Sequence, residues 1–239
     1  MDQISPVYKI KCLFAGETSV GKSSMVSLFR NNFHDPTIEP TIGMGFAATS
    51  TVLEEYNLDK NDLPKFYLKE KNHNYKQIVK AHHWDAAGSM RFRSIVKSYT
   101  RDLDIVFLVF SLNDYSSWQA LPKWKEEIDK SNKYDSIPMY VLIGTKSDLR
   151  PYHVPDYEIQ SLCAEWNVKR YIISNIQKNS ADLVRSLLYK TIKDYHQHIL
   201  DLKESGQEIP EHITLEYNSK QTKPIDLDVE SGSKFCCFQ

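Results

Sequence analysis

Residues 16–23, Gly-Glu-Thr-Ser-Val-Gly-Lys-Ser, constrain the fold of this chain more than any other feature of its sequence. They fit the pattern G-x-x-x-x-G-K-[ST], and they lie between a predicted strand at 8–15 and a predicted helix at 22–31. The glycines let backbone N–H groups approach phosphate oxygens, and the helix N-terminus adds the positive end of its dipole. Lys22 would neutralise the β- and γ-phosphates, and the Ser23 hydroxyl is a hard ligand for Mg²⁺. The motif therefore predicts a nucleotide-phosphate site at a strand–loop–helix junction.

Strand and helix patterns alternate along the rest of the chain. Continuous apolar runs such as 105–111 are typical of strands buried on both faces, and apolar residues near 3.6 spacing indicate amphipathic helices. The predicted elements are strands at 8–15, 105–111, 139–144 and 170–174, and helices at 22–31, 118–130, 155–166 and 181–198. This alternation predicts an α/β fold with a parallel, doubly wound sheet.

Composition excludes several classes of protein. The chain has 239 residues, of which 41% are hydrophobic and 26% charged, as in ordinary globular proteins. The net charge of −1 gives no field that would hold nucleic acid by its phosphates. Four cysteines do not make a disulfide scaffold, which favours a reducing compartment. No apolar run approaches the ~20 residues that cross a bilayer.

Two stretches depart from the α/β pattern. Residues 54–76 are polar and lysine-rich, and predict either a long loop or an extended hairpin. After residue 198 the composition changes: residues 201–239 hold eight acidic residues, four lysines and few large apolar residues. We therefore expect one domain at 1–198 with an insertion at 54–76, followed by a flexible tail at 199–239.

A second motif indicates which base the site takes. Thr145-Lys146-Ser147-Asp148 follows the apolar run at 139–144 and fits the pattern [NT]-K-x-D. The Asp148 carboxylate can accept from two donors of guanine, N1–H and the exocyclic amine. Adenine presents no such donor pair, so a carboxylate here selects guanine nucleotides.

Together these motifs resemble those of small GTPases of the Ras superfamily, and most closely the Rab branch. The resemblance is carried by GETSVGKSS at 16–24, PTIG at 40–43, WDAAG at 84–88, TKSD at 145–148 and the C-terminal cysteine pair, and it covers residues 8–195. It implies a P-loop GTPase fold, with a mostly parallel six-stranded sheet flanked by about five helices. It also implies exchange of GDP for GTP with Mg²⁺, and a role in vesicle trafficking.

The resemblance assigns roles to individual residues. It implies metal ligands at Ser23, Thr41 and Asp85, and places Thr41, Gly88 and Ser89 at the reacting phosphate. The residues expected to contact the nucleotide are Gly16, Glu17, Thr18, Ser19, Val20, Gly21, Lys22, Ser23, Ser24, Phe33, Thr41, Gly88, Thr145, Lys146, Asp148, Leu149, Asn175, Ile176 and Gln177.

Several positions depart from the family pattern. Ser89 stands where the family usually has the glutamine that orients the attacking water, and serine is too short to span that distance. Phe33, the expected ring over the base, lies one residue farther from Thr41 than usual. The last guanine-site element, normally Ser-Ala-Lys, aligns with Asn175-Ile176-Gln177, where the backbone N–H of Ile176 would serve the guanine oxygen. The stretch from Thr41 to Asp85 is also longer than in a typical Rab.

The C-terminal residues Cys236-Cys237-Phe238-Gln239 predict prenylation, and fit both C-a-a-X and double-cysteine signals. One lipid chain gives only marginal binding, so stable anchoring needs a second signal. Because the tail is acidic, two prenyl groups, one on each cysteine, are the favoured reading.

Three functions remain open from the sequence. The first is a GTP-hydrolysing switch on the cytoplasmic face of an intracellular membrane, cycling with the cytosol. Its expected partners are effectors, an exchange factor (GEF), an activating protein (GAP), the prenylation and escort machinery and GDI, and its G domain is expected to be monomeric. The second is a hydrolysis-deficient scaffold that recruits effectors constitutively, which Ser89 favours. The third, a P-loop kinase or ATPase, fits poorly with TKSD and the C-terminal cysteines.

Overall fold

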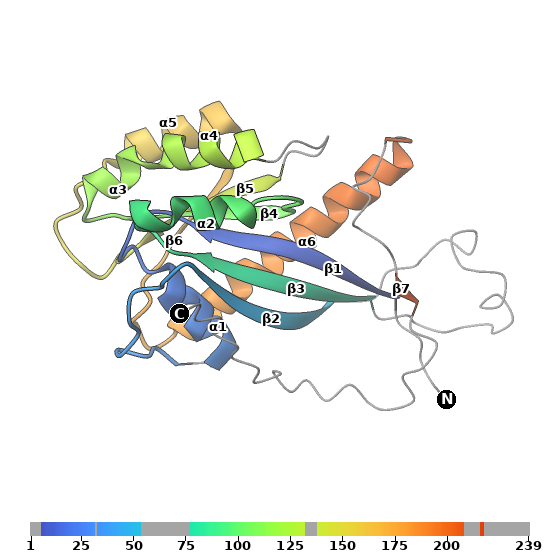
Figure 1. The fold of residues 1–239 in the computed structure, drawn as a ribbon, viewed down its shortest axis with the longest axis horizontal. Coiled ribbons are helices and arrows are strands. Elements are labelled where there is room, and N and C mark those ends of the chain that lie inside the picture. Colours follow the sequence, from blue (N-terminus) through green and yellow to red (C-terminus); the bar gives the residue numbers. More distant parts are fainter. Residues whose placement is uncertain (1–5, 32, 54–76, 132–137, 208–215, 218–239) are drawn as a thin grey trace, which may run out of the picture.

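A computed structural model of the chain describes residues 6–31, 33–53, 77–131, 138–207 and 216–217. Its centre is a sheet with the strand order β2-β3-β1-β4-β5-β6, to which β7 adds by pairing with β1 (Figure 1). All neighbouring strands from β3 to β6 are parallel, whereas β2 is antiparallel to β3 and β7 is antiparallel to β1. The strands are β1 (Pro6–Ala15), β2 (Met44–Leu53), β3 (Gln77–Ala86), β4 (Ile105–Ser111), β5 (Met139–Thr145), β6 (Lys169–Ile172) and β7 (Glu216–Tyr217).

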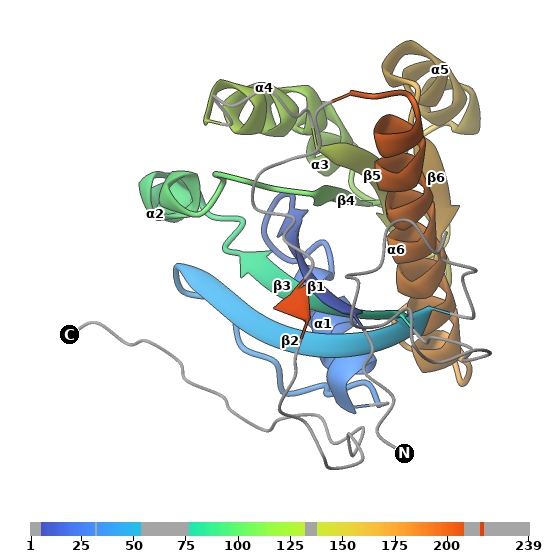
Figure 2. The same cartoon turned by 90° about the vertical axis from the view of Figure 1, so that its right-hand side faces the viewer.

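Helices cover both faces of this sheet (Figures 1 and 2). The helices are α1 (Lys22–Asn31), η3 (Met90–Phe92), α2 (Arg93–Ser98), α3 (Tyr115–Gln119), α4 (Leu121–Ser131), α5 (Asp156–Trp166) and α6 (Ser180–Glu204). With α3 and α4 counted as one interrupted helix, the predicted α/β fold, with a mostly parallel six-stranded sheet and five helices, is confirmed. Among the described residues no helix is long and apolar enough to cross a membrane.

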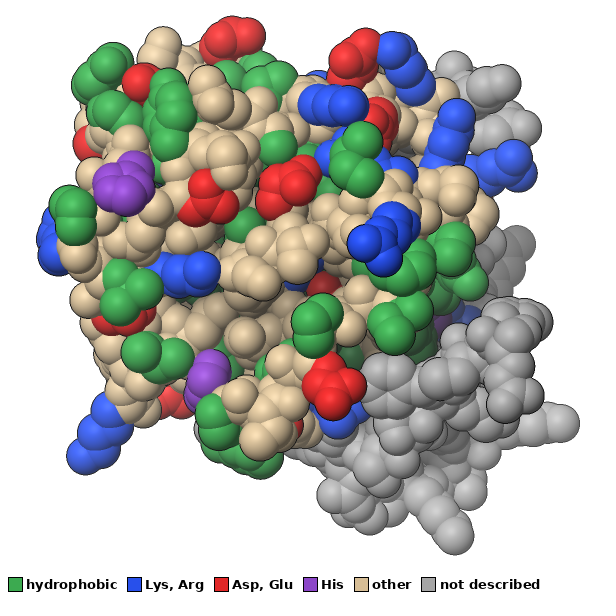
Figure 3. Space-filling view, turned by 60° about the vertical axis from the view of Figure 1, so that its left-hand side comes forward, with side chains coloured by type: hydrophobic (Ala, Val, Ile, Leu, Met, Phe, Trp, Pro, Cys, Tyr) green, Lys and Arg blue, Asp and Glu red, His purple; other side chains and the backbone are tan. Residues whose placement is uncertain are grey.

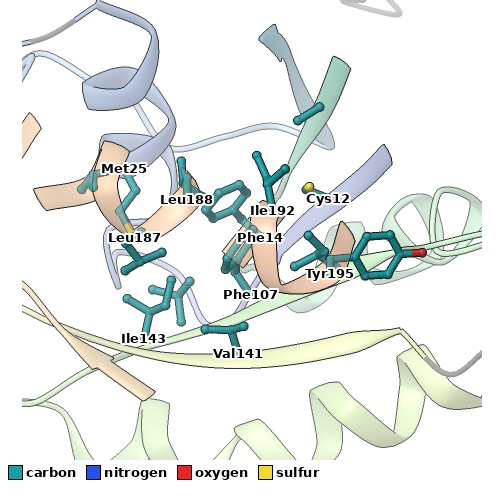
Figure 4. Close-up of a cluster of buried hydrophobic side chains, with 14 of the residues drawn as sticks. Cys12, Phe14, Met25, Phe107, Val141, Ile143, Leu187, Leu188, Ile192 and Tyr195 are labelled. Atoms are coloured by element: carbon teal, nitrogen blue, oxygen red, sulfur yellow. The ribbon is translucent and has the colours of Figure 1, made fainter. Parts of the chain in front are cut away.

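The alternating side chains of the strands divide the core into two clusters. On one face Phe14 stacks on Phe107, with ring centroids 4.7 Å apart, and both lie near Leu188 and Ile192 of α6 (Figure 4). On the other face Leu13 and its neighbours pack against α2, α3, α4 and α5. Burial of both faces explains why β4, with seven buried residues, reads as a continuous apolar run.

The prediction of a single helix at 118–130 was wrong. The structure has α3 and α4, separated at Ala120. Asp114 caps α3 by accepting from the N–H groups of Ser116 and Ser117, so the helical region begins earlier than the apolar spacing indicates. Pro122 lies in the first turn of α4, and because proline has no N–H the hydrogen-bond ladder is interrupted there.

Other boundaries also differ from the expectations. The last helix was expected to end at residue 198, but α6 continues to Glu204, and β7 pairs two further residues of the predicted tail with Pro6 and Val7. No strand was assigned to β2 or β3, which pair over their whole length, from Met44 opposite Ala86 to Leu53 opposite Gln77. The 54–76 stretch and the C-terminal cysteine pair lie outside the described residues.

Candidate functional site

The phosphate loop connects the end of β1 to the start of α1. Gly16 has φ +147°, and a Cβ there would lie 2.1 Å from the carbonyl oxygen of Val109, so only glycine fits. Lys22 is buried, and its ammonium donates to the carbonyl oxygens of Gly16 (2.8 Å) and Glu17 (2.7 Å). Burial lowers the pKa of Lys22 to about 8, against the opposing effect of Asp85 and Glu17. The loop therefore encloses a desolvated cation, as a phosphate site requires.

Three oxygen-bearing side chains from distant segments meet beside this lysine. The Ser23 hydroxyl donates to Oδ2 of Asp85 (2.5 Å) and lies 2.7 Å from the hydroxyl of Thr41, which in turn lies 3.1 Å from the same Asp85 oxygen. Ser23 comes from α1, Thr41 from the segment before β2, and Asp85 from the end of β3. The structure thus brings together all three metal ligands that the sequence predicts.

This cluster fits a magnesium ion. The other oxygen of Asp85, Oδ1, is buried without a hydrogen-bond partner in the described structure. Desolvation raises the pKa of Asp85, although the Ser23 and Thr41 hydroxyls and Lys22 act in the opposite direction. A buried carboxylate with an unpaired oxygen favours a nearby cation, and hydroxyl and carboxylate oxygens are ligands that Mg²⁺ prefers. Bound there, the ion would neutralise charge on phosphate oxygens.

Gly88 follows β3 and lies directly against the phosphate loop. A Cβ added to it would lie 2.3 Å from both the carbonyl carbon of Glu17 and the amide nitrogen of Thr18, so no larger residue fits without movement. Ser89 comes next, just before η3, and its side chain makes no capping hydrogen bond. The 88–89 segment is thus held at the loop by backbone contact.

A cavity of about 450 Å³ lies at the carboxyl ends of the strands and connects these parts. Figure 3 views this face, which has a hollow near its centre with Lys and Arg side chains on both sides. The cavity is lined by Thr18, Ser19, Gly21, Lys22, Ser23, Ser24, Ile38, Glu39, Pro40, Thr41, Ile42, Ser89, Arg91 and Phe92. Phe33 and Asp148 do not line it; Phe33 is exposed and Asp148 is half-buried.

The base-side residues occupy two loops beside the phosphate loop. The buried Thr145 hydroxyl lies 2.5 Å from the carbonyl oxygen of Val20 and 3.0 Å from that of Phe110, so Thr145 ties β5 to the phosphate loop. Lys146 has φ +58°, and Leu149 closes the turn by donating its N–H to the Lys146 carbonyl oxygen. The structure therefore gives Thr145 a structural role that its motif alone does not specify.

The Asn175-Ile176-Gln177 element contacts the same loop. The Asn175 side-chain amide donates to the carbonyl oxygen of Gly21 (3.0 Å), while its Oδ1 is buried without a partner among the described residues. The Ile176 N–H expected to serve the guanine oxygen lies 3.3 Å from the Ser174 hydroxyl, and Ile176 itself is exposed. The Gln177 carbonyl accepts from the N–H of Ser180.

The sequence analysis missed Ile38, Glu39, Arg91 and Phe92, which line the cavity. Proximity to PTIG and WDAAG was the only signal that indicated them. It also missed Arg93 and Trp124, which bond to the side chain of Glu17 from two different helices. Since Trp124 is 107 residues from Glu17, no local pattern indicates the contact.

A loop-bound lysine, an oxygen cluster for Mg²⁺ and a guanine-type motif together define a nucleotide-binding α/β protein. A family model described as Ras family matches residues 11–197. Because that match covers most of the chain, the protein belongs to the Ras family, whose members are small GTPases that bind GTP and GDP with Mg²⁺. The kinase or ATPase alternative is thereby set aside.

Proposed function

We propose that this protein is a Rab-type switch, anchored by prenyl groups on the cytoplasmic face of an intracellular membrane, where it regulates vesicle trafficking and cycles with the cytosol. The observation that carries the proposal is an exposed apolar surface next to both loops at the phosphate site. We call it the switch patch, and it consists of Ile42, Phe46, Met90 and Ile95.

The switch patch is joined to the nucleotide site through the chain itself. Ile42 directly follows Thr41, and Met90 directly follows Ser89. The two halves are close together, since a Cβ on Gly43 would lie 3.8 Å from Ile95. Hydrophobic side chains gather beside the hollow in Figure 3. Since exposed apolar surface favours a protein partner, the position of Thr41 and Gly88 would decide whether effectors bind.

Phe46 tests the effector surface directly, because it is one of the exposed residues of the patch. Its ring packs on Trp84, with ring centroids 4.8 Å apart. Phe46→Ala should leave the protein membrane-bound but no longer confined to one organelle, as seen by fluorescence microscopy. The matched control is Tyr157→Ala, an exposed aromatic on α5. Unchanged confinement of Phe46→Ala would contradict the proposal.

Membrane anchoring is proposed to depend on Cys236 and Cys237. Replacing both by Ser should make the protein fully soluble, and either single change should leave weak, reversible binding, because one lipid chain is a marginal anchor. Cell fractionation measures this, and mass spectrometry counts the prenyl groups. Cys163→Ser, in α5, is the control. A double variant that stays on membranes would require a different anchor.

Slow intrinsic hydrolysis, which only a GAP raises to a useful rate, is the second part of the proposal. Ser89 lines the cavity but is too short to orient a water as glutamine does, so unaided turnover should not exceed the rate of about 10⁻⁴ per second at which Ras hydrolyses GTP without a GAP. A Rab-type GAP that supplies both arginine and glutamine would restore the reaction. Ser89→Gln should therefore raise the intrinsic rate and change the stimulated rate little in single-turnover assays.

The same position also favours an alternative, a hydrolysis-deficient scaffold that recruits effectors constitutively. The two functions differ in whether a GAP can stimulate GTP hydrolysis. If neither Rab-type GAPs nor Ser89→Gln produce measurable hydrolysis, the scaffold is the better description. Equal unaided rates for wild type and Ser89→Gln would instead show that residue 89 does not orient the water.

A further inference from the structure

The side chain of Glu17 leaves the phosphate loop and bonds to two helices. Its Oε1 accepts from the guanidinium of Arg93 (3.0 Å) and from the indole N–H of Trp124 (3.0 Å). Arg93 is the first residue of α2, and Trp124 lies in α4. One carboxylate oxygen of the loop therefore holds two elements that are distant in sequence.

Arg93 is itself held on three sides. Besides Glu17, its guanidinium bonds to Glu127 of α4 at 2.7 Å, and its central carbon lies 4.2 Å from the centre of the Trp124 ring. Only 13% of the Arg93 side chain is exposed. A planar guanidinium held by two carboxylates and an aromatic ring has little freedom to reorient.

The segment that ends at Arg93 begins at Gly88, which packs on the peptide between Glu17 and Thr18. Glu17 thus fixes both ends of the 88–93 segment, because its backbone contacts Gly88 and its side chain binds Arg93. Ser89 and Arg91, which line the nucleotide cavity, lie between these two fixed points. Their placement depends on how firmly the ends are held.

We propose that Arg93 is a positioning residue that acts through Glu17 to hold the 88–93 segment in place for the terminal phosphate of GTP. The inference rests on the guanine-nucleotide binding of the Ras family, and it is independent of the Rab-type proposal. GDP lacks the phosphate that this segment would meet. The Glu17–Arg93 ion pair therefore contributes to GTP affinity and little to GDP affinity. Loss of the pair leaves the segment to be ordered by GTP itself, at an entropic cost.

The test is a double-mutant cycle on the full chain with Mg²⁺, in which affinities for GDP and for a non-hydrolysable GTP analogue are measured. Arg93→Gln should lower the ratio of GTP-analogue to GDP affinity about tenfold, the scale of a partly buried charged hydrogen bond. In a protein that already carries Glu17→Gln, the same change should lower the ratio less than about twofold. If Arg93 acted only through its long-range charge, Arg93→Gln would lower the ratio equally in the Glu17→Gln protein. The cycle therefore separates the Glu17–Arg93 contact from a long-range effect of the Arg93 charge.

Two further variants make the test specific. Glu127→Gln removes the other carboxylate partner of Arg93 without touching the phosphate loop, and should lower the ratio less than about twofold, because Arg93 keeps its bond to Glu17. Trp124→Phe keeps an aromatic ring at this position but removes the indole N–H that donates to Glu17, so it should lower the ratio by a smaller factor than Arg93→Gln.

The outcomes that would overturn the proposal are distinct. Equal weakening of both nucleotides by Arg93→Gln would show a merely structural role, and independent effects of the Arg93 and Glu17 changes would show no coupling. A wild-type protein that binds neither guanine nucleotide would overturn the family function together with the inference.

Discussion

The hydroxyl groups of Ser23 and Thr41 lie 2.7 Å apart, and both lie within hydrogen-bond distance of the same oxygen of Asp85. Thr41 belongs to the segment that enters β2, so this contact draws that segment onto the start of α1. A metal ion that bound these oxygens would therefore join the phosphate loop to the segment bearing Ile42 of the switch patch. Such a link would make the exposed surface depend on the state of the nucleotide site, as the proposed switch requires.

Removing the Ser23 hydroxyl should weaken the Mg²⁺-dependent part of nucleotide binding. We expect Ser23→Ala to lower GTP affinity at least tenfold and GDP affinity less, because a metal ion held there would neutralise more phosphate charge in GTP than in GDP. The affinities are to be measured with Mg²⁺ and again with a chelator, where wild type and variant should converge. Ser23→Thr keeps the hydroxyl and serves as the control. Equal losses with and without Mg²⁺ would argue against a metal ligand at residue 23.

Gly88→Ala should force the 88–93 segment away from the phosphate loop. The added methyl would lie 2.3 Å from backbone atoms of Glu17 and Thr18, so one of the two segments must shift. GTP-analogue affinity should therefore fall tenfold or more, with GDP affinity nearly unchanged. Gly206→Ala is the control for backbone strain alone, since φ there is +71° but a Cβ meets nothing within 4 Å. Wild-type GTP binding by Gly88→Ala would mean that this contact does not affect the site.

Asp148→Asn should weaken guanine nucleotides and reduce the preference for GTP over ATP. Two hydrogen bonds to a charged acceptor, at about 1.5–3 kcal/mol each, correspond to a loss of 100-fold or more in affinity. Competition between GTP and ATP measures the preference directly. Asp156→Asn, which removes an exposed carboxylate on α5, should change neither quantity. An unchanged preference in Asp148→Asn would place base selection elsewhere.

His196 should make the fold less stable in acid. Its side chain on α6 is 3% exposed, and burial lowers its pKa to about 4. The unfolded chain, with a pKa near 6.5 at this residue, takes up the proton first, so stability present above pH ~6.5 is lost as the pH falls towards 4.

The measurement is the melting temperature of GDP-bound protein between pH 7.5 and 5. Wild type loses about 2 kcal/mol at this residue by pH 5, so the melting temperature of His196→Leu should fall by about 4–8 °C less than that of wild type over this range. His198→Leu, at an exposed position of the same helix, should follow the wild type. Parallel curves for wild type and His196→Leu would mean that His196 is not the titrating group.

Local sequence patterns were sufficient to predict the bounds of elements that are buried on both faces or that begin at a motif. β4 was predicted with its observed bounds because both of its faces are buried, and α1 because the phosphate motif fixes where a helix must begin. Where a single residue interrupts the pattern, prediction failed. The break at Ala120 depends on the missing N–H of Pro122, and the pairing of β2 with β3 depends on a partner strand beyond the 54–76 stretch.

The sequence by itself predicted the chemistry that we assign to this protein: a lysine and a serine at the phosphates, a carboxylate for guanine and a serine where glutamine is usual. Those roles follow from residue types at fixed spacing, because a loop of a few residues has few ways to present them. Only the tertiary structure decided that Glu17 holds Arg93 and Trp124, and that Thr145 and Asn175 fasten the phosphate loop. Such contacts join residues 76 to 154 positions apart, and their geometry is set by how the helices pack on the sheet, which no local pattern encodes.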